Sequence, residues 1–159
     1  MRKPIFASSL LQIYGESRKS SPGKKVKQEK YDFTGKRILL AEDNVINAEI
    51  AQKLLEMVGF TVDVAENGVE AIRDFTKEKD GAYSAILMDV RMPFMDGLEA
   101  TRTIRSIKKK DSRTIPIIAM SANAFDEDIR KSIDVGMNAH LSKPIDADLL
   151  YKTLGSLIF

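Results

Sequence analysis

The chain has 159 residues, which is enough for one domain with a hydrophobic core and some additional chain. It contains no cysteine and a single histidine, which excludes disulfide bonds, thiolate metal sites and sites with several histidine ligands. The net charge of +2 is unevenly distributed, because residues 37–159 hold sixteen basic and twenty acidic residues and the basic excess lies before them. No apolar run is long enough to span a membrane and the first residues lack a signal peptide's apolar core, so we expect a cytoplasmic fragment, even if its parent protein is anchored in a membrane.

The segment before residue 36 differs in composition from the rest. Residues 16–29 combine Ser, Pro, Gly and Lys with one apolar residue, which predicts a flexible basic linker over residues 16–35. Basic segments can bind nucleic acid or anionic lipid, but no aromatic or arginine-rich pattern is interleaved with this one. We therefore interpret it as solvated, and expect no contact of this fragment with nucleic acid or membrane.

From residue 36 onward, short apolar runs alternate with segments of helical periodicity. The predicted strands and helices follow one another as 37–41, 45–58, 61–65, 68–78, 84–88, 97–107, 114–120, 125–135, 138–142 and 146–158. The first helix has the clearest pattern, with Ile46, Ile50 and Leu54 at a spacing of four residues. Gly59 follows this helix where a left-handed cap is expected, and Asp146 precedes the last helix as an N-cap.

The order of these elements predicts the fold class. Five successive βα units favour an α/β fold with a doubly wound parallel sheet, in three layers with helices on both faces. The runs at 84–88 and 114–120 agree with this, because strands covered on both faces are apolar throughout. In such sheets ligands bind beyond the carboxyl ends of the strands.

Polar side chains stand at the ends of four of the five predicted strands. They are Glu42 and Asp43 after the first strand, Asp89 after the third, Ser121 after the fourth and Lys143 after the fifth. Each has an ordinary explanation alone, as a helix cap or a surface residue. Asp89 is harder to explain in this way, because it ends an apolar run and a buried carboxylate without a partner is costly. Together they predict a site at one edge of the sheet.

The residue types indicate the chemistry of that site. Three carboxylates without thiol or imidazole suit a hard cation, so we expect Mg²⁺, for which Mn²⁺ can substitute. Beside such an ion Asp89 can attack phosphorus as a nucleophile and form an acyl phosphate. Lys143 offers a positive charge and Ser121 a hydroxyl donor to the phosphoryl oxygens.

Four sequence blocks resemble the signatures of response-regulator receiver domains from two-component systems. These are AEDN at 41–44, MDVRMPFMDG at 88–97, AMSA at 119–122 and LSKPI at 141–145, within a predicted domain of residues 36–159. The resemblance implies a flavodoxin-like sheet with strand order 2-1-3-4-5. It also implies a phosphoacceptor domain that takes a phosphoryl group from a kinase phosphohistidine onto Asp89 and relays the signal by conformational change or onward transfer. Such a domain promotes its own phosphorylation and dephosphorylation but is not a turnover enzyme.

Site roles follow from the same resemblance. Around Mg²⁺ it implies Asp43, Asp89, the carbonyl of Arg91 and Glu42, the last directly or through water. Lys143 and Pro144 are expected to form a cis peptide, and Ser121 to turn toward the phosphoryl group on activation.

Two further positions are expected to modulate the site. Asn123 is implied to tune dephosphorylation, together with Arg91. His140 stands where many members of the family carry Tyr or Phe, so a switch through an aromatic ring is in doubt, and a half-buried strand residue without a role is an alternative.

The first fifteen residues suggest what precedes this domain. Six residues between 3 and 15 recur at an offset of 140 in the last strand–helix unit, beginning with KPI in both places. We interpret residues 1–15 as the C-terminal helix remnant of a preceding receiver-like domain, within a hybrid histidine kinase with tandem receivers. The expected partners are a histidine kinase dimerisation-phosphotransfer domain and a histidine phosphotransfer domain. Because the remnant is apolar, it is also expected to dock on its own domain or on a second copy.

Other functional classes fit the sequence less well. A phosphatase of the haloacid-dehalogenase type needs a second Asp two residues beyond the nucleophile, and Arg91 occupies that position. A phosphate-inert pseudo-receiver would have lost the acids, the nucleophile or the lysine. A nucleotide switch would need a Gly-rich loop after the first strand, which is absent here.

Overall fold

A computed structural model describes residues 31–122 and 126–159 of the chain. The expected helix remnant at 1–15, most of the expected linker and Asn123 lie outside the described residues.

The strands form one parallel sheet in the predicted order, β2-β1-β3-β4-β5. They are β1 (Arg37–Ala41), β2 (Thr61–Ala65), β3 (Ala85–Asp89), β4 (Ile117–Ser121) and β5 (Ala139–Ser142). The doubly wound α/β prediction with order 2-1-3-4-5 is therefore confirmed. β3 begins and ends one residue later than expected, so that Asp89 belongs to the strand and its backbone pairs with Met120 of β4.

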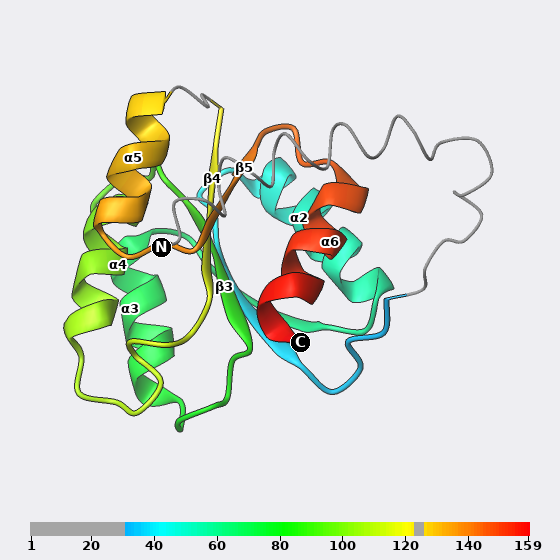
Figure 1. The fold of residues 1–159 in the computed structure, drawn as a ribbon, viewed down its shortest axis with the longest axis horizontal. Coiled ribbons are helices and arrows are strands. Elements are labelled where there is room, and N and C mark those ends of the chain that lie inside the picture. Colours follow the sequence, from blue (N-terminus) through cyan, green and yellow to red (C-terminus); the bar gives the residue numbers. More distant parts are fainter. Residues whose placement is uncertain (1–30, 123–125) are drawn as a thin grey trace.

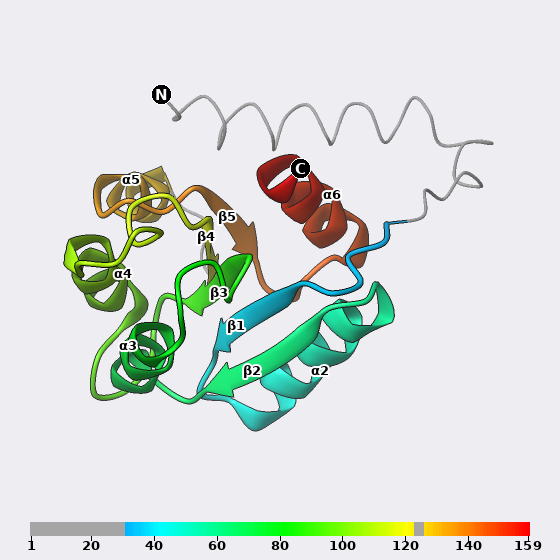
Figure 2. The same ribbon diagram turned by 90° about the horizontal axis from the view of Figure 1, so that it is seen from below.

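Helices cover both faces of the sheet, which gives the three expected layers. They are α2 (Val45–Met57), α3 (Gly68–Lys77), α4 (Gly97–Ser106), α5 (Asp126–Asp134) and α6 (Ala147–Ile158). α2 and α6 lie on one face, α3 and α4 on the other, and α5 lies beside the edge strand β5 (Figures 1 and 2).

The core consists of two clusters separated by the sheet. Alternate residues of β1, β3 and β4 contribute to each, for example Leu40 and Leu87 to the α2–α6 side and Leu39 and Ile86 to the α3–α4 side, all fully buried. Burying each such side chain contributes ~1.5–3 kcal/mol. This packing fixes the strands against one another and hence the positions at which they end.

The first helix presents a different face to the core than its spacing suggested. Its buried residues are Ala48, Ala51 and Leu55, whereas Ile46 and Ile50 are 66% and 51% exposed. The small side chains allow α2 to lie close to the sheet, and the branched residues are left on the outer surface near its N-terminus. The pattern of apolar residues alone does not distinguish a core stripe from an apolar surface.

The N-terminal described segment packs on the domain. Phe33 is fully buried and stacks on Phe60 with ring centroids 4.5 Å apart, and its backbone N–H donates to the carbonyl of Val58. These aromatic side chains, which lie before the expected boundary at residue 36, therefore contribute to the hydrophobic core.

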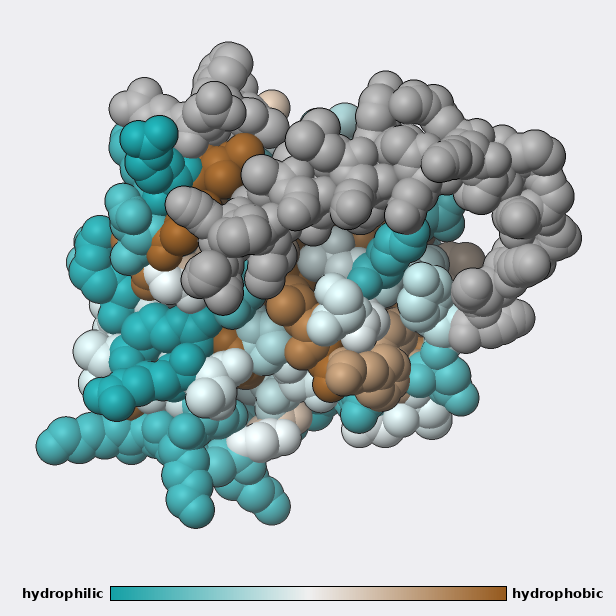
Figure 3. Space-filling model, in the orientation of Figure 1, coloured by the Kyte–Doolittle hydropathy of each residue, from teal (hydrophilic) through white to brown (hydrophobic). Residues whose placement is uncertain are grey.

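The surface at the amino ends of the strands is formed by two loops. The loops that follow α3 and α4, at the amino ends of the strands, expose mostly charged side chains, and this part of the surface is hydrophilic (Figure 3). Within residues 31–122 and 126–159, none of the helices combines the length and apolar character needed to cross a bilayer.

Candidate functional site

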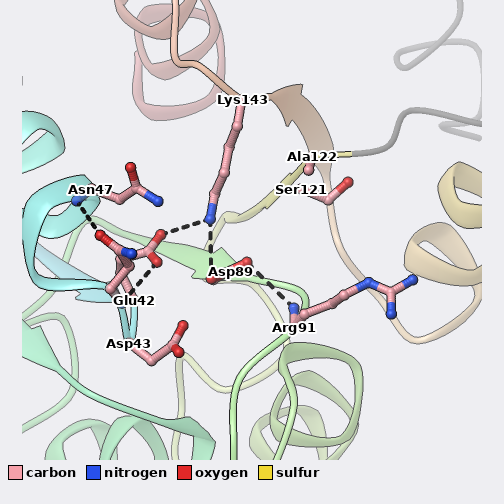
Figure 4. Close-up of a pocket in the computed structure, with 9 residues that line it drawn as sticks. Glu42, Asp43, Asn47, Asp89, Arg91, Ser121, Ala122 and Lys143 are labelled. Atoms are coloured by element: carbon pink, nitrogen blue, oxygen red, sulfur yellow. Dashed lines mark hydrogen bonds and ion pairs between the residues drawn. The ribbon is translucent and has the colours of Figure 1, made fainter.

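The carboxyl ends of the strands surround an open pocket of about 240 Å³. It is lined by Glu42, Asp43, Asn44, Asn47, Asp89, Arg91, Ser121, Ala122 and Lys143 (Figure 4). All five side chains predicted from the strand ends thus lie at one pocket, because parallel strands end at the same edge. Pockets for larger organic ligands have ~300–1,000 Å³, so this one is better suited to a small group such as a phosphoryl with an ion.

Asp89 lies at the base of this pocket as the last residue of β3, and it is 4% exposed. Its Oδ2 lies 3.1 Å from Nζ of Lys143, and its Oδ1 accepts a hydrogen bond from the backbone N–H of Arg91 at 3.3 Å. Gly97, the first residue of α4, packs so closely behind it that a Cβ there would collide with the Asp89 carbonyl oxygen. Lys143 and the Arg91 N–H thus hold the two carboxylate oxygens, and Gly97 confines the backbone of Asp89.

Lys143 bridges two buried carboxylates. Its Nζ lies 2.9 Å from Oε1 of Glu42, which is 3% exposed, in addition to its contact with Asp89 (Figure 4). The other carboxylate oxygen of Glu42 accepts from the backbone N–H of Asn44 at 3.1 Å. Both oxygens of Glu42 are thus occupied by donors from the protein.

The electrostatics of the cluster oppose ionisation of Asp89. Burial and the nearby charge of Glu42 raise the pKa of Asp89 to about 7, and Lys143 only partly offsets this. For Lys143, burial alone would lower the pKa, but the hydrogen bonds and charges of Glu42 and Asp89 outweigh it and raise the pKa. One ammonium therefore does not neutralise the site, which leaves a net negative charge that a cation can balance.

The acidic residues also meet the geometric requirement for a metal site. Glu42, Asp43 and Asp89 each offer a carboxylate oxygen, and these oxygens all lie within 4.8 Å of one another. Asp43 is exposed and lies two residues beyond the end of β1, so its carboxylate reaches the pocket from the rim. An oxygen-only donor set fits a hard divalent cation such as Mg²⁺.

The first turn of α2 completes the rim. Asn44 caps this helix, since its side-chain oxygen accepts a hydrogen bond from the backbone N–H of Asn47 at 2.9 Å. Asn47 also lines the pocket, although no sequence motif pointed to it. Its position three residues after the cap, in the helical turn that follows β1, is the signal that would have placed it there.

Ser121 and His140 form a buried pair beside the pocket. Both are 6% exposed, and Oγ of Ser121 lies 3.3 Å from Nε2 of His140. His140 is therefore a buried residue with a direct contact to a predicted site residue. The peptide bond between Lys143 and Pro144 is cis, as the resemblance implied.

Comparisons with known proteins show the family of this chain. Residues 38–155 match the family model of the response regulator receiver domain. The chain is 44% identical to hybrid signal transduction histidine kinase B of Dictyostelium discoideum over 74% of its length, and 37% identical to probable histidine kinase 1 of Oryza sativa subsp. indica over 69%. It spans 6% and 14% of these two proteins, so only a small part of each is compared.

A solved structure has the same fold. The receiver domain of a sensor histidine kinase from Pseudomonas aeruginosa PAO1 superposes with a TM-score of 0.71 at 38% sequence identity, covering 79% of this chain and 98% of that one. That structure has a magnesium ion coordinated in its active site cleft.

Proposed function

Because this chain belongs to the response regulator receiver domain family, with the match extending over residues 38–155, we propose that it accepts a phosphoryl group on Asp89 from the phosphohistidine of a histidine kinase. The observation that carries the assignment is the position of Asp89. Its carboxylate is buried at the base of the pocket, next to Lys143 and within metal-binding range of Glu42 and Asp43.

The transfer itself is a displacement at phosphorus. A carboxylate oxygen of Asp89 forms the new O–P bond, and the P–N bond of the donor breaks with its electron pair left on the imidazole nitrogen. A proton on the other ring nitrogen of the donor makes the leaving imidazole neutral. Lys143 then holds a phosphoryl oxygen by charge, and the hydroxyl of Ser121 donates to another.

A divalent cation is required to balance the charge. When bound, Mg²⁺ neutralises the carboxylates and the incoming phosphoryl oxygens, and Mn²⁺ is expected to substitute. We assign Asp43, Asp89 and the backbone carbonyl of Arg91 as ligands. Glu42 would hold the ion directly or through water, and Lys143 and the backbone N–H of Asn44 keep its carboxylate in place.

The phosphodonor needs a docking surface around the pocket. Val45 and Ile46, between the pocket residues Asn44 and Asn47, are 70% and 66% exposed. Phe94, in the loop between β3 and α4, is 88% exposed. These apolar side chains support contact with a helical phosphohistidine domain of a histidine kinase or phosphotransfer protein, since exposed apolar groups beside a polar pocket favour a protein partner.

The similarity to histidine kinases supports a hybrid kinase as the parent protein. In that arrangement residues 1–15 are the end of a preceding receiver-like domain and a basic linker connects it to the domain described above. The direction of onward signalling is then either transfer to a histidine phosphotransfer domain or a change in the surface of the receiver.

Intact-protein mass spectrometry with acetyl phosphate tests the proposal. The wild-type chain with Mg²⁺ should gain a single phosphoryl adduct that hydroxylamine removes, and a chelator should prevent it. Asp89→Asn should gain none, whereas Asp96→Asn, which removes an exposed carboxylate at the start of α4, should behave as wild type. An adduct that persists in Asp89→Asn would remove Asp89 as the acceptor.

A further inference from the structure

The hydroxyl of Ser121 has a buried imidazole, that of His140, as a neighbour. Register places Ala119 of β4 opposite His140 of β5, and Ser121, two residues further along β4, lies on the same face of the sheet as that histidine. Both side chains are buried, and Oγ and Nε2 are within hydrogen-bonding distance at 3.3 Å. Ser121 at the same time lines the pocket that contains Asp89.

The two tautomers of the imidazole have opposite consequences for this hydroxyl. A serine has one proton to donate and can accept through its lone pairs, and a neutral imidazole donates at one nitrogen and accepts at the other. If Nε2 lacks a proton, the hydroxyl donates its hydrogen bond to Nε2, and its proton points away from the pocket. If Nε2 carries the proton, it donates to Oγ and leaves the hydroxyl proton for an acceptor in the pocket.

We propose that His140 is a positioning residue for phosphoryl transfer, in which Nε2–H donates to Oγ of Ser121 and so directs the hydroxyl proton to the phosphoryl group on Asp89. The inference rests on the proposed roles of Asp89 and Ser121, and it adds the hydrogen bond between His140 and Ser121 to the one between Ser121 and the phosphoryl group. A hydrogen bond received by Oγ also polarises the hydroxyl and makes it a stronger donor. A ring without a nitrogen at this position provides neither effect.

The nuclear magnetic resonance signals of the imidazole test the tautomer directly. The chain contains a single histidine, so every imidazole ¹⁵N signal of the untagged protein comes from His140. We expect a protonated, pyrrole-like Nε2 in the full chain, and a change in its shift when beryllofluoride and Mg²⁺ are added as the phosphoryl mimic. In Ser121→Ala the mimic should still bind, as followed by ¹⁹F, without the change at Nε2. A pyridine-like, unprotonated Nε2 in the wild type would overturn the proposal.

A double-mutant cycle tests the same link by rate. His140→Phe should slow phosphorylation by acetyl phosphate about fivefold, the effect of losing one hydrogen bond of ordinary strength. In the Ser121→Ala background the same change should have no further effect, because the group that it positions is gone. His140→Gln, which keeps an N–H donor, should restore most of the rate, and Ser142→Ala should leave it unchanged as the neighbouring hydroxyl control.

The outcomes separate this inference from the proposed function. If His140→Phe slows both backgrounds equally, or if His140→Gln is as slow as His140→Phe, His140 acts by packing and the positioning role is wrong. If the wild type gains no adduct and binds no beryllofluoride, the assignment of Asp89 fails, whatever the state of the ring.

Discussion

Removing the charge of Asp89 should stabilise the folded protein when no divalent cation is present. The side chain is 4% exposed, and burial with the adjacent charge of Glu42 raises its pKa from 3.8 to about 7. Ionising such a carboxyl above neutral pH costs the folded state ~4 kcal/mol relative to the unfolded chain. This pKa already includes the attraction of Lys143. Asp89→Asn avoids the ionisation cost but replaces a carboxylate oxygen that accepts a hydrogen bond from a backbone N–H, so we expect a gain of ~2–4 kcal/mol in the free energy of unfolding.

The sign of the pH dependence follows from the direction of the pKa shift. A group whose pKa is raised by folding binds its proton more tightly in the folded state. Its contribution to stability is therefore full below pH 3.8 and is lost as the pH rises through about 7. The advantage of Asp89→Asn should be largest in alkaline buffer and should diminish toward acidic pH.

Urea unfolding with a chelator, measured at several pH values, checks this reasoning. Asp43→Asn is the matched control, because it removes an exposed acid of the same cluster and should gain less. Saturating Mg²⁺ should stabilise the wild type and reduce its difference from Asp89→Asn, since the cation binds the folded state. An Asp89→Asn variant that is no more stable than the wild type in alkaline buffer, or whose advantage grows on acidification, would refute the account of the cluster.

Three other substitutions have defined expectations. Lys143→Ala leaves Glu42 and Asp89 buried without the ammonium that they share. In alkaline buffer with a chelator we expect urea unfolding to show a loss of ~2 kcal/mol, and with Mg²⁺ we expect phosphorylation to be ~100-fold slower. Unchanged stability and rate would contradict the role of Lys143. Gly97→Ala places a methyl group against the Asp89 carbonyl oxygen. Thermal unfolding should show a loss of ~1–3 kcal/mol in the free energy of unfolding, and the phosphoryl adduct should form more slowly. Wild-type behaviour would disprove the tight packing at Gly97. Arg105→Met removes hydrogen bonds to the carbonyls of Gly136 and Ser112 and to the side chain of Asn138, which join α4 to two loops. Urea unfolding should show a loss of ~2–4 kcal/mol in the free energy of unfolding, and the phosphorylated residue should not change. An equally stable variant would show that these bonds contribute little.

The sequence predicted the sheet and the site residues because both depend on local patterns. Each strand is a short apolar run, and a parallel sheet brings the residue after every run to the same edge. That geometry joins Glu42, Asp89 and Lys143 although they are far apart in the chain.

Other features depend on packing that a single pattern does not encode. The exposed position of Ile46 on α2 results from the use of Ala48 and Ala51 as the buried face, and both faces contain apolar residues. The occupation of both Glu42 oxygens, by Lys143 and a backbone N–H, likewise required the structure. The contact between Ser121 and His140 depends on the register of β4 and β5, which spacing along the chain does not fix.

The most direct test of the central claim is to identify the residue that carries the phosphoryl group. After reaction with acetyl phosphate and Mg²⁺, borohydride reduction converts an aspartyl phosphate to homoserine, which peptide mass spectrometry can locate. We predict homoserine at position 89 and at no other acidic position, and none when a chelator is present. Reduction at Asp43, at Glu42 or at a carboxylate outside the pocket, or labelling that does not depend on the cation, would contradict the account.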